Sequence, residues 1–219
     1  MFRWLSALAL VVFMGTSLFA QEPQVPLFGF ASPGAAADWQ AVNDGVMGGV
    51  SDGRFKITDR QTLEFYGTLS LENNGGFASV RSRPRTLGLR AGDTIVARLR
   101  GDGREYQLNL YTGDRRMAFS YRAPARTRGG EWIEVRIPLN EFEATSFGQV
   151  VAGAGPVDPG SVTSVGFLLA EKTPGPFALE VAWIKILRGP DRKSSTPGAP
   201  GRSALRTGVQ SEFRGARGR

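Results

Sequence analysis

Apolar and polar residues alternate along most of the chain between residues 53 and 187. Alternation over four to eight residues is typical of half-buried β-strands. Gly, Pro, Asn and Asp separate the runs, and no long segment has the period of an amphipathic helix. The pattern therefore predicts about eight strands, of which the clearest cover residues 63–71, 95–100, 106–111, 117–121, 133–137, 161–170 and 177–186.

Turn residues between the runs predict how neighbouring strands connect. The runs 95–100 and 106–111 flank Gly101-Asp102-Gly103, whose turn chemistry predicts a β-hairpin. In the last run the apolar face changes phase after Trp183, which predicts either a β-bulge there or burial on both faces. A single helical turn is expected at residues 140–142 and an irregular Gly/Pro loop at 150–160.

About eight short strands with one apolar face each predict an all-β fold, an antiparallel β-sandwich of the jelly-roll kind. The 219 residues are enough for one sizeable domain. We expect four regions: a signal peptide at 1–20, an N-terminal linker at 21–37, the sandwich domain at 38–188 and a disordered basic tail at 189–219.

The first twenty residues predict export. Arg3 supplies a positive start, residues 5–18 form an apolar run, and Ala20 offers a small cleavage residue. A mitochondrial transit peptide would be amphipathic and richer in Arg and Ser. We therefore expect an exported protein, periplasmic or secreted. A membrane anchor formed by an uncleaved signal is the alternative, because Leu18 stands where a smaller residue is usual.

Most of the net positive charge of the chain lies outside its predicted domain. The sequence pI is about 10.3 and the formal net charge is +7, but residues 189–219 hold +5 of it and residues 21–188 only +1. A nearly neutral domain gives no indication of nucleic-acid binding. Contact with a membrane is expected only through the tail or an uncleaved signal.

Histidine and cysteine are absent from the whole chain. Nucleophilic sites of the Ser-His-Asp and Cys-His kinds therefore lack their base, and zinc sites lack their usual ligands. We predict no enzyme activity, no cofactor and no metal site. A glycosidase-like carboxylate pair remains an alternative, as does a structural calcium held by Asn43, Asp44 and Asp52.

Outward strand positions mix aromatic rings with polar donors, as surfaces that recognise sugars or polar peptides do. An ordinary solvated sheet face is the competing interpretation. Trp132 falls opposite the apolar face of its strand and is either a stacking residue or packed beneath a loop. The outward residues are Tyr66, Arg98, Arg100, Gln107, Asn109, Tyr111 and Arg122.

Three Gly-rich segments have the most distinctive sequence: Asn43–Ser51 with the preceding Trp39, Asn73–Arg81, and Arg100–Tyr106. Together with Trp132, Ile137-Pro138, Phe142, Lys172 and Gly175-Pro176-Phe177, they resemble the complex I intermediate-associated protein 30 family. The resemblance implies a galactose-binding-like β-sandwich, similar in shape to certain carbohydrate-binding modules, with no catalytic site. It also implies a chaperone-like role in assembling NADH:ubiquinone oxidoreductase.

Two binding functions follow as hypotheses. The first is chaperone-like binding of unfolded or partly assembled protein partners, and the alternative is recognition of envelope or extracellular carbohydrate. For Arg81 an ion pair with Asp44 or Glu72 competes with a ligand contact. The candidate binding residues are Trp39, Asn43, Asp44, Met47, Asn74, Arg81, Asp102, Arg104, Tyr106, Gln107, Asn109, Tyr111, Trp132 and Lys172.

Overall fold

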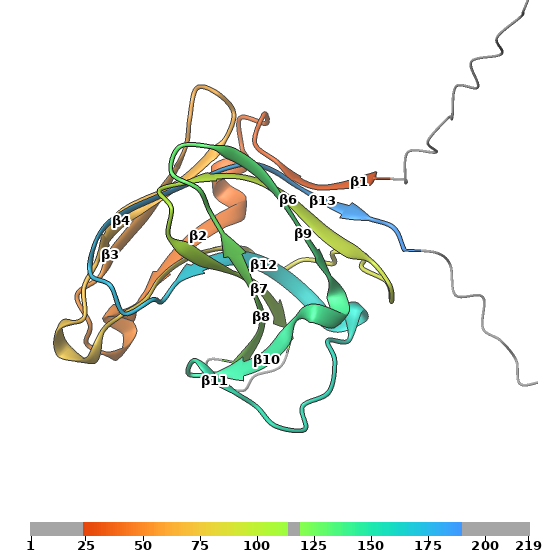
Figure 1. Cartoon of the computed structure of the whole chain (residues 1–219). Helices are drawn as coiled ribbons and strands as arrows, with labels where there is room; N and C mark the ends of the chain where they lie inside the picture. The colour runs from red at the N-terminus through yellow and green to blue at the C-terminus, as the bar shows by residue number, and fades with distance from the viewer. Residues whose placement is uncertain (1–23, 114–118, 190–219) are drawn as a thin grey trace, which may run out of the picture.

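A computed structural model describes residues 24–113 and 119–189. Two sheets pack face to face, and every strand pair within them is antiparallel (Figure 1). The predicted antiparallel β-sandwich is therefore confirmed. The predicted signal peptide lies outside the described residues, as does nearly all of the predicted tail. Within the described ranges, no helix has the length and apolar character needed to cross a membrane.

The first sheet, sheet A, has the strand order β3-β4-β13-β6-β9, with β1 added beside β13. The long strand β13 is its centre, since it pairs with β4 along its first half and with β1 along its second. The strands of sheet A are β1 (Gln24–Gly29), β3 (Asp52–Ile57), β4 (Leu63–Leu69), β6 (Thr94–Gly101), β9 (Trp132–Pro138) and β13 (Gly175–Leu187).

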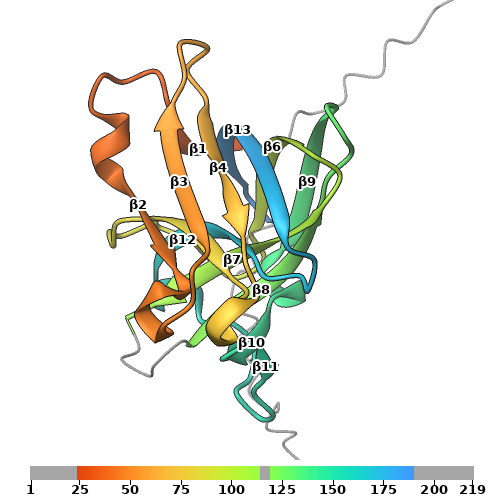
Figure 2. The ribbon, with the colours of Figure 1, turned by 90° about the vertical axis from the view of Figure 1, so that its left-hand side faces the viewer.

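The second sheet, sheet B, has the order β11-β10-β8-β7-β12-β5-β2. Figure 2 shows its strands crossing those of sheet A at a steep angle. The strands of sheet B are β2 (Trp39–Asn43), β5 (Ala78–Ser82), β7 (Glu105–Thr112), β8 (Phe119–Arg126), β10 (Glu143–Ser146), β11 (Gln149–Val150) and β12 (Val162–Leu169).

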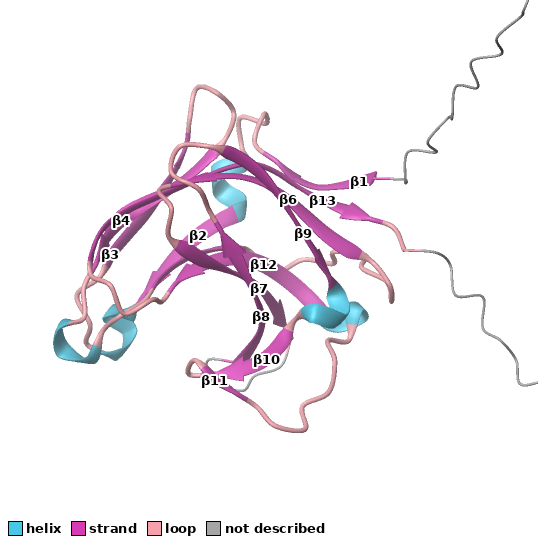
Figure 3. Ribbon diagram, in the orientation of Figure 1, coloured by secondary structure: helices cyan, strands magenta, loops and turns pink. Residues whose placement is uncertain are grey.

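In the described residues, helix is confined to single 3₁₀ turns, drawn cyan in Figure 3. One of them, η4, confirms the turn predicted at residues 140–142. The strand count was underestimated because β1, β2, β3, β5, β10 and β11 are short or alternate weakly in sequence. The turns are η1 (Ala35–Asp38), η2 (Asp44–Met47), η3 (Glu72–Asn74), η4 (Leu139–Glu141) and η5 (Pro159–Ser161).

Alternate side chains from both sheets meet in one apolar core. Phe65 of sheet A and Phe167 of sheet B are fully buried there, and Leu108 and Leu110 of β7 point into the same space. Each buried apolar side chain of this size contributes about 1.5–3 kcal/mol to folding. The core therefore accounts for the pattern of alternation along the chain.

Residues 24–37 belong to the sandwich, which corrects their expected role as a linker. Strand β1 pairs with β13. The rings of Phe28 and Phe30 are buried, with centroids 5.1 and 5.8 Å from that of Trp39. These apolar rings bind the segment to the domain because leaving them in water would cost more than ordering the chain.

The connection at Gly101-Asp102-Gly103 is a tight turn but not a hairpin, so that prediction is wrong. Strand β6 pairs with β13 and β9 in sheet A, whereas β7 pairs with β12 and β8 in sheet B. Gly103 has a φ of 98°, and the Asp102 carboxylate accepts a hydrogen bond from the Arg104 N–H at 3.1 Å. Local chemistry thus makes the turn, while contacts with distant strands decide that it crosses between the sheets.

The bulge predicted near Trp183 is confirmed. The register between β13 and β6 shifts between Val181 and Trp183. After the shift Ile184 and Ile186 face the core, and Trp183 lies on the outer face with the Lys185 ammonium 4.1 Å from its ring centroid. One extra residue therefore lets a single strand keep its apolar side inward along both halves.

Candidate functional site

The outward polar and aromatic residues fall on two different surfaces. Gln107, Asn109, Tyr111 and Arg122 lie on the outer face of sheet B, on β7 and β8. Tyr66, Arg98 and Arg100 lie on the outer face of sheet A, on β4 and β6. The sequence suggested that these aromatic and polar residues share one surface. Because the chain crosses from sheet A to sheet B at residues 101–103, they lie instead on opposite sides of the sandwich.

One row of residues crosses the outer face of sheet B over six adjacent strands. The register pairs Arg81 with Gln40 and Gly166, Asn109 with Gly166 and Arg122, and Arg122 with Glu143. Neighbouring residues in the row are therefore about 4.8 Å apart along the hydrogen-bonding direction. We call Gln40, Arg81, Gly166, Asn109, Arg122 and Glu143 the outer row.

Arg81 and Tyr111 stack at the centre of this face. The Arg81 guanidinium carbon lies 4.7 Å from the Tyr111 ring centroid. The Tyr111 hydroxyl accepts a hydrogen bond from Asn109 Nδ2 at 3.2 Å, and Asn109 is only 1% exposed. Asn109 therefore fixes the ring on which Arg81 rests. The predicted ion pair of Arg81 with Asp44 or Glu72 is not formed, because Arg81 points to the sheet face and Asp44 is engaged elsewhere.

Arg122 is the second cation of the outer row. Its Nε donates to the Ser120 hydroxyl at 3.3 Å. Burial lowers the pKa of Arg122, and the nearby Tyr111 opposes that shift only in part. Within residues 24–113 and 119–189, no carboxylate lies at ion-pair distance from Arg81 or Arg122. Both guanidinium groups are thus partly buried, and neither is ion-paired with a carboxylate of the described residues.

Two buried polar atoms of the outer row have no hydrogen-bond partner, namely Arg81 Nε and Asn109 Oδ1. Such atoms are uncommon in folded proteins, and each calls for an explanation such as strain, a functional role, or a bound water or ion. Gln107 is different, since its Nε2 donates to Glu105 Oε1 at 3.3 Å. Among the described residues, two of the four buried side-chain atoms without a partner therefore belong to the outer row, and the other two are Asn43 Oδ1 and Arg104 Nη1.

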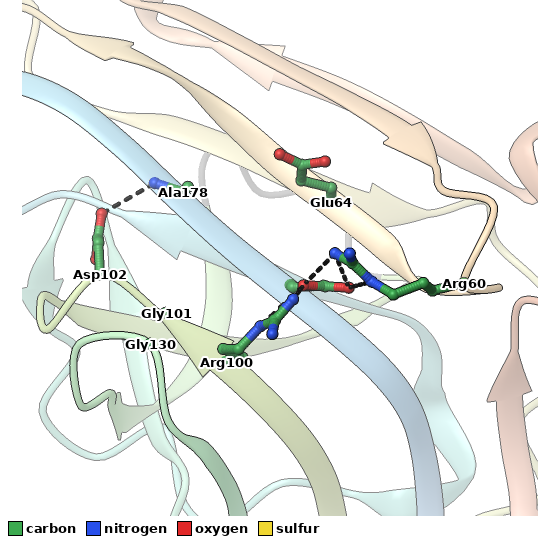
Figure 4. A pocket seen from close by; sticks show the side chains of 8 residues that line it. Arg60, Glu64, Arg100, Gly101, Asp102, Gly130 and Ala178 are labelled. Atoms are coloured by element: carbon green, nitrogen blue, oxygen red, sulfur yellow. Dashed lines mark hydrogen bonds and ion pairs between the residues drawn. The ribbon is translucent and has the colours of Figure 1, made fainter.

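The outer face of sheet A carries a hollow of about 290 Å³. Figure 4 shows Arg60 and Arg100 reaching from two sides to the carboxylate between them, which belongs to Glu180. Arg100 Nε donates to Glu180 Oε2 at 3.0 Å, Arg60 Nη2 donates to Oε1 at 3.1 Å, and the Thr62 hydroxyl donates to Oε1 at 2.6 Å. This cluster is internally satisfied.

Two carboxylates line this hollow, as a glycosidase-like acid and base would. Glu64 and Glu180 are directly opposed on β4 and β13 and both line the hollow. Burial alone would raise the pKa of Glu180, but hydrogen bonds from Thr62, Arg100 and Arg60 lower it below its ordinary value. Glu64 is ion-paired with Lys56 at 3.1 Å. A general acid needs a raised pKa, and the pKa of Glu180 is shifted in the opposite direction.

Trp132 is half-buried beside this hollow. The guanidinium carbons of Arg98 and Arg100 lie 5.6 and 4.9 Å from its ring centroid. Tyr66 lies on the same sheet face, with the Lys56 ammonium 5.1 Å from its ring centroid. Both rings therefore have cationic side chains close to them. These side chains would have to be displaced in part for a sugar to stack on the rings.

Asp44 joins two of the Gly-rich segments. Its carboxylate is fully buried and accepts hydrogen bonds from the Ser51 N–H at 2.9 Å, the Ser51 hydroxyl at 2.6 Å, the Gly76 N–H at 2.7 Å and the Phe77 N–H at 3.2 Å. A Cβ on Gly49 would lie 2.4 Å from the Asp44 Cγ. A Cβ on Gly75 would lie 2.7 Å from Asp44 Oδ2, so packing around this structural carboxylate requires glycine at positions 49 and 75.

The loops that Asp44 joins expose apolar side chains. Val46 is 74% exposed, Met47 52%, Val50 50% and Leu71 40%. Figure 3 shows η2 and η3, the two cyan turns at the lower left, side by side. We call these four residues the loop patch. Asn74 is exposed on the same pair of loops, while Asn43 donates from Nδ2 to the Gly53 carbonyl at 2.9 Å.

The remaining candidate residues are structural or scattered. Trp39 is a core residue. The Tyr106 hydroxyl donates to Asp102 at 3.1 Å, and Arg104 Nε pairs with Glu171 at 2.8 Å. Burial raises the pKa of Tyr106, and the Asp102 charge adds to that rise. Lys172 is exposed. In the described part of the chain, no cluster of acidic side chains that could hold a metal ion is present, and Asp44 and Asp52 have separate partners.

Sequence reasoning missed three contributors to these surfaces. Glu180 and Arg60 form the ion-pair cluster of sheet A although 120 residues separate them, and no local pattern connects them. Gly166 sits between Arg81 and Asn109, where a Cβ would lie 2.4 Å from the Val80 carbonyl oxygen. A glycine inside a strand was the one available signal, because it often marks a close backbone approach.

Comparison with known sequences identifies one family. Residues 28–181 match the profile of the family described as complex I intermediate-associated protein 30. A mouse (Mus musculus) protein named "Complex I intermediate-associated protein 30, mitochondrial" is 31% identical over 174 residues, covering 69% of this chain and 52% of its own. The Drosophila melanogaster protein of the same name is 27% identical, over 76% of this chain and 64% of its own. The chain thus spans about half the length of the mouse relative.

The names of these relatives overturn the predicted localisation. Both are named as mitochondrial proteins, as is a Caenorhabditis elegans relative. This points to the mitochondrion and away from the exported, periplasmic or secreted location that we expected from residues 1–20. The expectation depended on a segment outside the described residues.

Comparison with solved structures supports the fold alone. A family 11 carbohydrate-binding module from Clostridium thermocellum, solved with a mixed-linked tetrasaccharide, superposes with a TM-score of 0.55. It is 15% identical in sequence, and the match covers 76% of this chain and 96% of the module. The sandwich architecture is therefore shared with carbohydrate-binding modules.

Proposed function

Because this chain belongs to the complex I intermediate-associated protein 30 family, we propose that it acts in the assembly of complex I without catalysing a reaction. Its action is chaperone-like: it binds protein partners that are unfolded or only partly assembled. The mitochondrial names of the relatives support the mitochondrion as the place of this action. The absence of histidine and cysteine agrees with a binding role.

The loop patch is the observation that carries the proposal. Most exposed large apolar side chains of a soluble surface are scattered, whereas Val46, Met47, Val50 and Leu71 lie on two loops joined by the Asp44 carboxylate. Methionine adapts its shape to different apolar partners. A rigid support with an adaptable apolar surface suits binding of varied, incompletely folded chains.

Replacement of the apolar side chains tests this function. We expect the triple variant Val46→Ser, Met47→Ser, Val50→Ser to lose co-purification with complex I assembly intermediates from mitochondria, and to lose suppression of aggregation of an unfolded complex I subunit. Val25→Ser is the matched control, since Val25 is 36% exposed on β1, away from the patch. Retention of both activities by a folded triple variant would refute the assignment of the patch.

Carbohydrate binding is the second candidate. Trp132 and Tyr66 on the outer face of sheet A support it, since half-buried aromatic rings among polar groups are suited to stacking on sugars. A glycan array with wild type and Trp132→Ala distinguishes the two functions. Saturable sugar binding that the substitution abolishes would favour this candidate, and its absence would leave protein binding.

A further inference from the structure

We propose that the outer row of sheet B binds an extended acidic segment of a partner protein, with Arg81 and Arg122 receiving its carboxylates. This inference rests on the proposed function only in taking the partner to be a protein. It deepens that function by naming the chemistry of the partner and a second contact surface.

The two cations differ from most arginines of the domain. Arg54, Arg100, Arg126 and Arg188, among others, have carboxylate partners within the described residues, whereas Arg81 and Arg122 have none. Both are held on central strands of a sheet rather than on solvated loops. An unpaired and partly dehydrated guanidinium gains most from a carboxylate ligand, because the charged hydrogen bond forms in a medium of low dielectric constant.

The side chains are already positioned for a ligand. Asn109 donates to the Tyr111 hydroxyl, and the Tyr111 ring lies under the Arg81 guanidinium. Asn109 itself is fixed between the core residues Leu108 and Leu110. This chain of contacts reduces the side-chain entropy that binding would otherwise cost.

The unsatisfied atoms indicate a ligand with both donors and acceptors. Arg81 Nε is a buried donor without an acceptor, and Asn109 Oδ1 is a buried acceptor without a donor. Turning the Asn109 amide by 180° would satisfy Oδ1 from the Tyr111 hydroxyl but leave the amide nitrogen unpaired. In either orientation, one polar atom awaits a partner. A peptide offers N–H and C=O groups as well as carboxylates.

An apolar turn next to Arg122 favours a protein over inorganic phosphate. A Cβ on Gly148 would lie 4.0 Å from Arg122 Nη1, so the β10–β11 turn borders the outer row. Phe147, at the tip of this turn, is 56% exposed with a φ of 47°, which a bulky residue rarely adopts. Inorganic phosphate offers no apolar group to meet this ring, and the nearly neutral charge of residues 21–188 gives no indication of nucleic-acid binding.

The spacing of the cations also suits an extended peptide. Arg81 and Arg122 are separated by three strand-to-strand steps, or roughly 14 Å at the backbone. Carboxylates four residues apart on an extended chain are separated by about the same distance. One acidic segment can therefore reach both guanidinium groups.

Binding of defined peptides to the purified full chain tests the proposal. The probe is a fluorescein-labelled peptide in which Glu and Leu are placed so that two Glu lie four residues apart, compared with the same peptide carrying Gln. We expect Arg81→Met and Arg122→Met each to weaken binding of the Glu peptide about tenfold or more. Fluorescence anisotropy measures the affinity, and circular dichroism confirms folding of each variant.

Arg126→Met is the matched control. Arg126 is on β8 like Arg122 and outward like it, but it is already paired with Glu105 at 2.6 Å. We expect this substitution to leave the affinity nearly unchanged. If Arg81→Met does not fold, Arg122→Lys takes its place, because it keeps the charge while losing the guanidinium geometry, and we expect it to weaken binding.

Three outcomes would overturn the inference. The first is equal affinity for the Glu and Gln peptides, and the second is an effect of Arg126→Met as large as that of Arg122→Met. The third is competition by inorganic phosphate at the concentration of the Glu peptide, which would indicate a general anion site. Co-purification of complex I intermediates tests the proposed function separately. If wild type and Arg122→Met co-purify equal amounts of the intermediates, the outer row is not a binding site for them, and the proposed function stands. If wild type co-purifies no intermediates but binding of the Glu peptide still depends on Arg122, the proposed function is wrong and the outer row remains a peptide-binding site.

Discussion

Replacing Asp44 with asparagine tests whether one buried carboxylate holds the loop patch in place. Asp44 Oδ2 accepts from the Ser51 hydroxyl and from the N–H groups of Gly76 and Phe77, while Oδ1 accepts from the Ser51 N–H. Asparagine has the same shape but one acceptor oxygen and no charge. Its best orientation keeps oxygen at the Oδ2 position and directs an NH₂ group at the Ser51 N–H.

The magnitude follows from these contacts. A buried N–H left unpaired costs about 1–3 kcal/mol, and each remaining bond loses the extra strength of a charged acceptor. We expect Asp44→Asn to lower the free energy of unfolding by about 3 kcal/mol at pH 7, a large share of the roughly 5–15 kcal/mol typical of domains. With a urea m-value of about 2 kcal/mol/M, the midpoint would fall by about 1.5 M.

The dependence on pH has a defined sign. Burial alone would raise the pKa of Asp44, but the hydrogen bonds from Ser51, Gly76 and Phe77 lower it below the ordinary value of 3.8. A carboxyl group whose pKa is lower in the folded state stabilises the protein fully above its ordinary pKa. That contribution is lost as the pH falls through the folded-state pKa. The gap between wild type and Asp44→Asn should therefore narrow in acid.

Urea titrations followed by tryptophan fluorescence at neutral and acid pH measure both effects. Asp52→Asn is the control, since the Asp52 side chain is 53% exposed and its partner Arg54 64% exposed, and such surface pairs contribute at most about 1 kcal/mol. An Asp44→Asn variant within about 1 kcal/mol of wild type, or a gap that stays constant down to the lowest pH, would refute the reasoning.

Other substitutions test the two sheet faces. Gly166→Ala should destabilise the domain by about 2 kcal/mol or more in urea titrations, because its Cβ would lie 2.4 Å from a backbone carbonyl oxygen. Gly29→Ala is the control and should be nearly neutral, since the space around Gly29 is open. Equal effects of the two substitutions would contradict the argument that Gly166 allows a close backbone approach. Glu180→Gln should cost about 1–3 kcal/mol at pH 7 by loss of a buried carboxylate acceptor, and since the pKa of Glu180 is lowered, the difference from wild type should shrink in acid titrations. Tyr106→Phe should cost about 1 kcal/mol by leaving the Asp102 carboxylate with one donor fewer; its thermal melt, compared with that of Asp102→Asn, would show no change if that bond were unimportant.

Individual strands were predictable where a long run of alternation coincides with burial. The runs at 63–71 and 106–111 became β4 and β7 with most of the expected residues inward, but β4 ends at Leu69 and Leu71 is exposed in the loop that follows. The phase change at Trp183 was visible in sequence because a bulge must shift apolar residues from one parity to the other. Short strands such as β10 were missed because four residues contain too few alternations to stand out from a loop.

The candidate site was less predictable, because it depends on which strands become neighbours. Asn109 and Arg122 are joined by a local β7–β8 pair, but Arg81 reaches them only through β12. Its suggested pairing with Asp44 failed since nothing in the sequence shows that Ser51, Gly76 and Phe77 already occupy that carboxylate. Sequence therefore provided the outward residues but not the row they form.

The amino-acid sequence alone indicated that this chain folds as a two-layer antiparallel sandwich, because its period-two apolar faces need covering and the sequence has no long helical segment to cover them. It also determined that histidine and cysteine chemistry is impossible. Only the tertiary structure decided that the turn at residues 101–103 crosses between the layers and divides the polar faces. The reason is physical: side-chain parity is local and is set by successive residues, whereas strand neighbours are chosen by contacts between segments far apart in the chain.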